Sequence, residues 1–366
     1  MSQTTYFTPG PSQLYPNIDG FIKDALDEDV GSISHRSGAF KSIYADTVSR
    51  LHQLLSLPEN FHVLFLGSAT ESWERIFNSL VEKKSYHYVN GSFSKKFHQY
   101  GIESGKESIK EEAPFGAGFD VDTTKIPQDT ELVAFTQNET SSGVMTGVED
   151  IEKVRKSHPN ALVAVDVVSS LPYPNFDYNN IDTLFFSVQK CFGLPAGLGV
   201  WIVNDRCVKK AEELKAKGHQ AGAHHTLLEL VSKAKENQTP STPNALNIYL
   251  LSRVLESMLE KGAEQIRKET DEKYELLHQL IAESSFLSES VENERHRSKT
   301  VIVANTAIEP SVINGYLKQF NMAVGSGYGS YKTSQIRIAN FPAHSTAAIK
   351  ELIEALKKEE LINQPA

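Results

Sequence analysis

The sequence predicts an α/β protein, with a large domain built on a mostly parallel sheet and a smaller C-terminal α/β domain. Three observations predict this fold. Short apolar runs typical of buried strands alternate with stretches whose apolar residues recur at helical spacing. Several of these strands end in polar clusters, where parallel sheets gather their ligand-binding groups. The chain also has 366 residues, more than one hydrophobic core usually serves, so we expect two domains of unequal size.

Composition and charge exclude several classes of protein. Hydrophobic residues make up 40% and charged residues 23% of the chain, as in ordinary soluble globular proteins. The net charge of −9 argues against nucleic acid or an anionic membrane as a partner. Two cysteines, Cys191 and Cys207, are too few for a disulfide framework, so we expect a cytoplasmic protein. We also expect no signal peptide and no membrane span.

The first third of the chain begins with a Pro-rich segment, residues 1–16, which we expect to form an extended arm. The clearest helix is expected at 69–81, whose apolar residues fall on one stripe, at Trp73, Ile76, Phe77, Leu80 and Val81. The other patterns here predict helices at 18–26 and 40–55 and strands at 62–66 and 86–90.

The rest of the chain continues the alternation. Runs rich in β-branched and aromatic residues predict strands at 132–136, 161–168, 183–188 and 200–203, with a helix at 149–157. A long helical stretch, 246–280, is interrupted near Gly262. The C-terminal part is expected to hold strands at 300–304 and 335–340 and helices at 312–320 and 346–361. We therefore divide the chain into an arm (1–16), a large domain (17–245) and a small domain (246–366).

The turn Gly67–Thr70 is a candidate phosphate site. It joins a strand to a helix N-terminus, where free backbone N–H groups and the positive end of the helix dipole favour an anion. Ser68 and Glu71 have the spacing of a capping box, so a plain capped helix is the alternative interpretation. The turn lacks the lysine of a nucleotide-binding P-loop.

Lys190 and Asp166 are the candidate catalytic residues. Lys190 follows a buried strand and precedes a Gly/Pro-rich loop, 193–199, so desolvation should lower its pKa and suit it to form a Schiff base with an aldehyde. The alternative is a lysine that extends into water. Asp166 is the single charge in an apolar strand, where a carboxylate is costly unless a cation pairs with it.

Together these features predict pyridoxal 5'-phosphate as the cofactor. Lys190 would hold its aldehyde carbon and later carry a proton, and Asp166 would keep the ring nitrogen protonated. Phe93 would stack on the ring, and Thr140 would hydrogen-bond the ring hydroxyl. The phosphate would be bound by Ala69, Thr70 and Gln189.

Many short motifs then carry a resemblance to a known family. They are FTPGP (7–11), SHRS (34–37), GSAT (67–70), NGSFS (90–94), NET (138–140), Asp166, QK (189–190), PAGLG (195–199), QTPST (238–242) and IR (336–337). In order and spacing they resemble class V aminotransferases of pyridoxal-phosphate fold type I and, within that class, the phosphoserine aminotransferases. The resemblance implies amino transfer between phosphoserine and 2-oxoglutarate, a step of serine biosynthesis.

The resemblance also implies a homodimer whose sites are shared between subunits. Gln238 and Thr239 would reach the cofactor phosphate of the neighbouring subunit. His35 and Arg36 would bind the distal acidic group of the amino-acid or 2-oxo-acid substrate, also across the interface. Arg337 would bind the substrate α-carboxylate.

The sequence departs from the phosphoserine aminotransferase pattern in three places. Phe93 stands where the family usually has tryptophan, and Gln238 where it has asparagine. A His-Arg pair before the carboxylate-binding arginine is missing from 329–334, where Lys332 is a partial substitute. The run SSGV (141–144) resembles alanine–glyoxylate and serine–glyoxylate aminotransferases, which are the alternative.

Other classes fit less well. A pyridoxal-phosphate lyase or cysteine desulfurase would share Lys190 and Asp166, but neither cysteine is placed as a mobile nucleophile. A non-catalytic relative that binds an acidic metabolite would have no need of both residues. His219, His224 and His225 lack acidic or cysteine partners at metal-binding spacing, so we predict a solvated loop and no metal.

Overall fold

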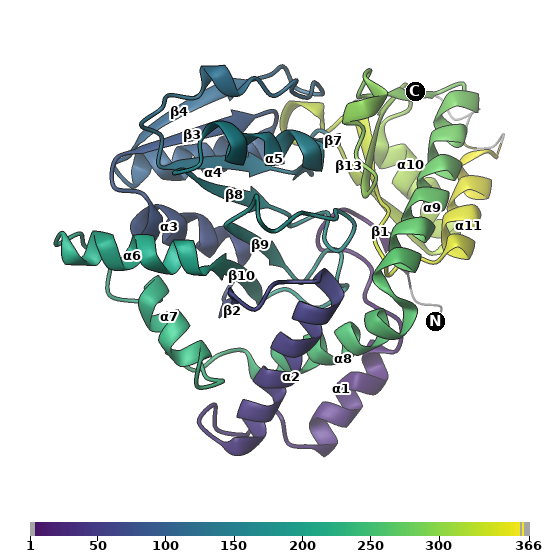
Figure 1. Ribbon diagram of the computed structural model, residues 1–366. Helices are drawn as coiled ribbons and strands as arrows, with labels where there is room; N and C mark the ends of the chain where they lie inside the picture. The colour runs from purple at the N-terminus through teal and green to yellow at the C-terminus, as the bar shows by residue number, and fades with distance from the viewer. Residues whose placement is uncertain (1–3, 359–360, 362–366) are drawn as a thin grey trace.

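A seven-stranded sheet forms the centre of the larger part of the molecule (Figure 1). The computed structural model describes residues 4–358 and residue 361, so the ends of the predicted arm and of the small domain lie outside it. The strand order is β2-β10-β9-β8-β5-β3-β4, and β10 is antiparallel to both of its neighbours while the other pairs are parallel. The predicted mostly parallel sheet is confirmed. The strands are β2 (Phe61–Leu66), β3 (Lys84–Val89), β4 (Glu107–Glu112), β5 (Leu132–Thr136), β8 (Leu162–Asp166), β9 (Thr183–Ser187) and β10 (Gly199–Asn204).

Helices cover both faces of this sheet because its central strands are apolar on both sides. In β8, Val163 and Val165 pack into one core with α2, α5 and α8, whereas Leu162 and Ala164 pack into another with α3, α4, α6 and α7. The helices of this part are α1 (Ile18–Asp27), α2 (Gly38–Leu55), α3 (Ala69–Leu80), α4 (Ser92–Glu103), α5 (Val148–Ser157), α6 (Asp205–Ala216), α7 (Leu227–Ala234) and α8 (Ala245–Lys261).

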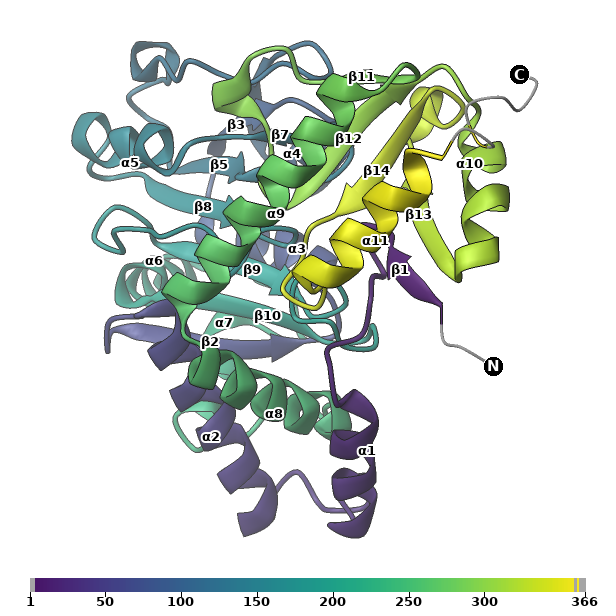
Figure 2. The ribbon, with the colours of Figure 1, turned by 90° about the vertical axis from the view of Figure 1, so that its right-hand side faces the viewer.

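A second, five-stranded sheet lies in the smaller part of the molecule, with the order β1-β13-β14-β12-β11. Helices α9 and α11 lie side by side over this sheet (Figure 2) and share its apolar core with α10. The elements are β1 (Thr5–Phe7), α9 (Ala263–Glu283), β11 (Leu287–Glu289), β12 (Val301–Thr306), α10 (Pro310–Leu317), β13 (Met322–Ser326), β14 (Gln335–Ala339) and α11 (Thr346–Leu356). A small hairpin, β6 (Asn138–Glu139) with β7 (Val144–Met145), lies in sequence between β5 and β8 of the large sheet.

The predicted arm belongs to the second sheet. Strand β1 pairs in parallel with β13, with Thr5 opposite Met322, and Phe7 is fully buried in the small core. The next residues run back to the large sheet, so this segment connects both parts.

The long helical stretch breaks at Gly262, as predicted, where the backbone takes a φ of 86°. Apolar residues of α8 pack into the large core, whereas α9 contributes to the small core from Tyr274 onward. The change from one core to the other therefore falls within α9, and a division at residue 245 stays a prediction.

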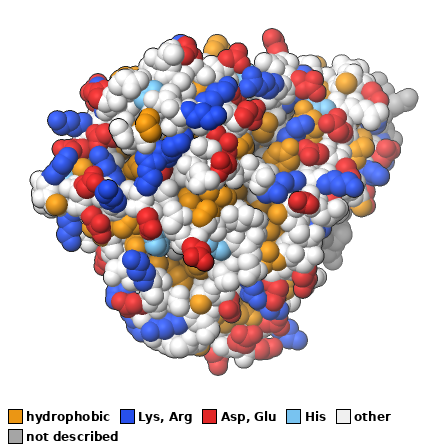
Figure 3. Space-filling model, in the orientation of Figure 1, with side chains coloured by type: hydrophobic (Ala, Val, Ile, Leu, Met, Phe, Trp, Pro, Cys, Tyr) orange, Lys and Arg blue, Asp and Glu red, His pale blue; other side chains and the backbone are white. Residues whose placement is uncertain are grey.

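On the face shown in Figure 3, acidic and basic side chains are intermixed. In the part of the chain that the structure describes, no helix has both the length and the apolar character needed to cross a membrane.

Candidate active site

A cavity of about 220 Å³ lies at the carboxyl edge of the large sheet. It brings together eight of the predicted site residues, which are Ala69, Thr70, Phe93, Thr140, Asp166, Gln189, Lys190 and Arg337. They meet because β2, β3, β5, β8 and β9 point the same way and each is followed by a polar turn. The wall also contains residues that the sequence analysis did not select, which are Pro9, Gly10, Pro11, Trp73, Thr136, Asn138, Val168, Ser187 and Tyr328.

Lys190 is buried at this edge, three residues after β9 ends at Ser187. Its Nζ donates a hydrogen bond to Thr140 Oγ1 at 2.9 Å and lies 5.1 Å from the centre of the Phe93 ring. Burial lowers the pKa of Lys190 to about 8, although the carboxylate of Asp166 acts in the opposite direction. The neutral, nucleophilic amine is therefore far more populated than in an ordinary lysine with a pKa of 10.5, although the ammonium form still predominates at pH 7.

Asp166 is the last residue of β8, and its carboxyl group is buried. Burial raises its pKa to about 7, while the N–H of Val168, which donates to Oδ1 at 3.0 Å, and the charge of Lys190 oppose that rise. A cationic group placed in the cavity would keep this carboxylate ionised. The nearby indole of Trp73 also lowers the pKa of Asp166, a contribution that the sequence did not reveal.

The phosphate turn has the predicted capped geometry. Ser68 caps α3 by accepting a hydrogen bond from the N–H of Glu71 at 3.3 Å, and Ala69 donates its N–H to Ser187 Oγ at 2.8 Å. Strand β10 passes so close that a Cβ at Gly199 would lie 2.3 Å from the carbonyl carbon of Ser68. Thr70 is exposed toward the cavity at the positive end of the helix, where an anion is favoured.

The N-terminal segment forms one wall of the cavity. Gly10 has a φ of 137°, which is open to glycine but strained for other residues, and a Cβ there would lie 2.8 Å from Cε of Lys190. Ser12 donates its backbone N–H to the carbonyl of Gln189 at 3.1 Å. The motif at 7–11 therefore packs against the reactive lysine.

Phe93 is held by a buried carboxylate from the β6 hairpin. Glu139 accepts hydrogen bonds from the backbone N–H groups of Phe93 at 3.0 Å and Ser94 at 2.8 Å, in the first turn of α4. It also accepts from the hydroxyl of Ser94 at 2.9 Å and from that of Ser141 at 2.6 Å. Because Thr140 is the next residue, Glu139 fixes two walls of the cavity at once.

Arg337 enters the cavity from β14 of the small sheet. Its Nε donates to the carbonyl of Ser326 at 2.7 Å, and its Nη1 donates to the carbonyl of Thr140 at 3.1 Å. In the described chain it pairs with no carboxylate, and burial lowers its pKa. Its charge is thus available to an anionic ligand.

The four residues predicted to act across an interface do not line this cavity. Arg36 donates to Gln238 Oε1, to the carbonyl of Thr239 at 3.0 Å and to that of Pro240 at 3.1 Å, so it anchors the loop after α7. His35 lies beside it, and Arg36 and burial together lower the pKa of His35. Thr239 lines a separate cavity of about 270 Å³, next to Gly67 on the outer side of the phosphate turn. Lys332 lines neither cavity.

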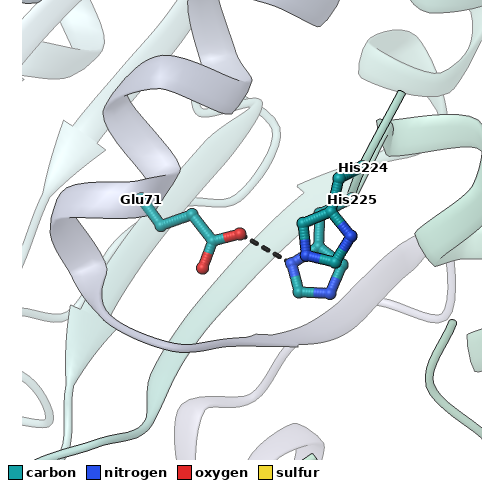
Figure 4. Close-up of side chains that lie close together, drawn as sticks. All are labelled: Glu71, His224 and His225. Atoms are coloured by element: carbon teal, nitrogen blue, oxygen red, sulfur yellow. Dashed lines mark hydrogen bonds and ion pairs between the residues drawn. The ribbon is translucent and has the colours of Figure 1, made fainter. Parts of the chain in front are cut away.

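Two of the three histidines noted in the sequence meet an acidic residue after all. The carboxylate of Glu71 and the rings of His224 and His225 lie within 4.8 Å of one another, a grouping that could hold a metal ion (Figure 4). Sequence spacing did not show it, because Glu71 comes from α3. In the structure, His225 Nδ1 bonds Glu71 at 2.6 Å and Nε2 bonds Ser241 at 2.9 Å, while Gly67 donates to Glu71 at 2.9 Å. These bonds join the phosphate turn to the 239–243 loop.

The cavity fits the predicted cofactor. It offers a lysine with a lowered pKa, a buried carboxylate without a cation in contact, an aromatic ring and a helix N-terminus that Gly199 leaves free. A mostly parallel sheet with this edge, joined to a small second sheet, is the fold of the type I pyridoxal-phosphate-dependent transferases, and this chain has that fold.

Comparison with known proteins leads to the same class of enzyme. The model of the aminotransferase class-V family matches residues 117–350. A phosphoserine aminotransferase structure from Cytophaga hutchinsonii ATCC 33406 is 53% identical, with a TM-score of 0.97, over 98% of this chain and 99% of that chain. The phosphoserine aminotransferase of Rhodococcus opacus (strain B4) is 25% identical over 358 residues, 96% of this chain and 93% of the relative. The chain is an aminotransferase and belongs to the class-V family.

One more distant structure shares the fold. A phosphoserine aminotransferase from Trichomonas vaginalis, described with bound pyridoxal phosphate, is 20% identical with a TM-score of 0.80, over 97% of this chain and 100% of that chain.

Proposed function

We propose that this chain is a pyridoxal-phosphate-dependent phosphoserine:2-oxoglutarate aminotransferase that serves serine biosynthesis. The observation that carries the proposal is the meeting of Lys190, Asp166 and Arg337 in one cavity, in a chain 53% identical to the Cytophaga enzyme. The substrates would be a small amino acid and a 2-oxo acid, each with a second acidic group.

The proposed mechanism assigns a task to each residue. When bound, pyridoxal phosphate supplies an aldehyde that takes up the amino group and a ring that accepts electrons from the substrate α-carbon. Lys190, whose lowered pKa increases its fraction of neutral amine, would take the proton from that carbon and return it to a neighbouring carbon. Asp166 would hold the proton of the ring nitrogen in place.

The remaining residues orient the reactants. Phe93 would cover one face of the ring. The Thr140 hydroxyl accepts from Lys190 at 2.9 Å and donates to Ser169 Oγ at 2.8 Å, so it would donate to the ring hydroxyl by exchanging the bond to Ser169. The N-terminal turn of α3 at Ala69 and Thr70, with Gln189, binds the phosphate. Arg337 binds the α-carboxylate, with its guanidinium held by two carbonyl groups.

We infer that the enzyme is a homodimer in the cytoplasm. Arg36, Gln238 and Thr239 form one hydrogen-bonded group outside the cavity of their own chain, and His35 stands next to Arg36, which supports a role of these residues in the partner's site. Both cysteines are buried and free, which suits a reducing compartment. Burial also raises the pKa of Cys191, so a desulfurase with this thiol as nucleophile is disfavoured.

A substrate panel tests the proposal. The purified enzyme should transfer amino groups between phosphoserine or glutamate and the matching 2-oxo acids with a higher kcat/KM than between alanine or serine and glyoxylate. A preference for glyoxylate would favour the alanine– or serine–glyoxylate alternative. Absence of any transfer, despite full cofactor loading, would favour a non-catalytic relative.

A further inference from the structure

Tyr328 lies in the wall of the cavity, between two cationic side chains. It follows β13 and is half-buried, and its ring centre lies 5.3 Å from that of Phe93. On one side, Cζ of Arg337 lies 5.4 Å from the Tyr328 ring centre. On the other, Lys96 donates from Nζ to the Tyr328 hydroxyl oxygen at 3.2 Å.

Lys96 is placed there by its position on α4. It stands three residues after Phe93, so the two side chains share one face of the helix. Its Nζ lies 5.6 Å from the ring centre of Phe93 and 5.8 Å from that of Tyr328. Among residues 4–358 and 361, no carboxylate lies within 4.0 Å of this amine, so its positive charge is not neutralised.

The hydrogen bond from Lys96 determines what the hydroxyl of Tyr328 can do. An ammonium group is a donor only, so the phenol oxygen accepts from it and its own hydrogen remains to be donated. The described part of the chain offers that hydrogen no acceptor. A hydroxyl polarised by a cation, with an unused hydrogen in a cavity wall, is suited to an anionic acceptor.

We propose that Tyr328, polarised by Lys96, binds the distal acidic group of the substrate, a phosphate or side-chain carboxylate, while Arg337 binds the α-carboxylate. This deepens the proposed function and rests on it. Tyr328 lines the cavity, and Lys96, which does not line it, is bonded to the Tyr328 hydroxyl, so the pair brings a polarised donor to the cavity wall. The family's His-Arg pair is missing from 329–334.

Ligand binding to the holoenzyme tests the pair without catalysis. Calorimetric titration with 2-oxoglutarate, in the absence of an amino donor, is compared with titration with pyruvate, which lacks the distal carboxylate. Losing one charge-assisted contact should cut the preference for 2-oxoglutarate about tenfold or more in Lys96→Gln and in Tyr328→Phe. Lys96→Arg keeps a positive charge at this position, so it should retain part of the preference for 2-oxoglutarate that Lys96→Gln loses.

Lys95→Gln is the matched control, because Lys95 is the adjacent lysine on the same helix, is exposed like Lys96, and loses the same charge. It should keep the wild-type preference. In kinetics, Lys96→Gln should lower the ratio of kcat/KM for glutamate to kcat/KM for alanine mainly through KM. Lys96 acts partly through the Tyr328 hydroxyl. The double variant Lys96→Gln/Tyr328→Phe should therefore lose less of the preference for glutamate than the product of the two single fold-losses.

The outcomes separate the two proposals. If wild type does not prefer 2-oxoglutarate over pyruvate, the proposed function itself is wrong. If wild type has the preference and both variants keep it as Lys95→Gln does, with cofactor absorption and melting temperature unchanged, only the assignment of Tyr328 and Lys96 is overturned.

Discussion

The protonation state of Lys190 depends on its surroundings more than on lysine chemistry. Burial lowers the pKa of Lys190, and the negative charge of Asp166 partly offsets that decrease. The titrations of Lys190 and Asp166 are therefore coupled, so a change in the charge of one side chain shifts the pKa of the other.

The pH dependence of cofactor capture should report this pKa. Because only the neutral amine attacks an aldehyde, the rate at which apo-protein takes up pyridoxal phosphate should rise with pH and level off near the pKa of Lys190, about 8. An ordinary lysine, with a pKa of 10.5, would show a continuing rise. In Asp166→Asn the plateau should move to lower pH, because a charge that raises the pKa is lost. Stopped-flow absorbance measures both, and an unshifted plateau would contradict the coupling.

Asp166→Asn should impair turnover far more than cofactor binding. Asparagine keeps the size of the side chain but cannot keep the ring nitrogen protonated, so the half-reaction with amino acid should slow about 100-fold or more, at least roughly 2.7 kcal/mol in barrier. Single-turnover absorbance gives the rate, and equilibrium dialysis gives cofactor affinity. A near-normal rate would mean that another group is the counter-ion.

At the scale of elements, α4 and the β6 hairpin are joined by one carboxylate. Glu139 is fully buried and accepts from both backbone and hydroxyl donors, so it acts as an external cap for α4. The positions of Phe93 and Thr140 both depend on it.

Glu139→Gln should disturb that junction. A glutamine amide would place an N–H₂ group against N–H donors, so the variant should lose about 1–3 kcal/mol of unfolding free energy. Chemical denaturation measures the loss, and a weaker cofactor affinity should accompany it because Phe93 moves. Glu103→Gln, at the exposed end of α4, is the control and should change neither quantity. Equal stability of the two variants would show that the cap is not needed.

Elements were predictable where apolar periodicity was strong, as in α3, β5 and the break between α8 and α9. Strand β4 was not predicted, because it is an edge strand whose ESIKEE residues are mostly polar and none of them is buried. Strand β1 was not predicted either, since three residues that pair with a strand at the other end of the chain carry no local pattern.

The site residues also divide into those that local sequence patterns predicted and those that depend on contacts between distant segments. Lys190, Asp166 and Thr140 were predictable because they lie at or shortly after the carboxyl ends of parallel strands, and all three line the cavity. Tyr328 and Pro9–Pro11 reach it only through the docking of the small sheet, which no short-range pattern describes.

At the scale of the whole molecule, the proposed homodimer would place the group around Arg36 in the site of a second copy. Subunits of Lys190→Ala and Arg36→Ala should each be inactive as homodimers. After mixing and exchange, about a quarter of all sites would have both residues intact, because half of the dimers are hybrid and each has one complete site. Activity should return to about that level. If exchange is demonstrated by differently tagged subunits and no activity returns, the shared-site arrangement is rejected.

The pairing of β1 with β13 has a consequence for how the enzyme is made. Residues 5–7 leave the ribosome long before residues 322–324, with which they pair. The large sheet can form earlier from strands close in sequence, whereas this last closure waits for the C-terminal strands. Until then, Pro9–Pro11 are not held against Lys190, so a nascent chain has its catalytic lysine before it has the wall that buries it.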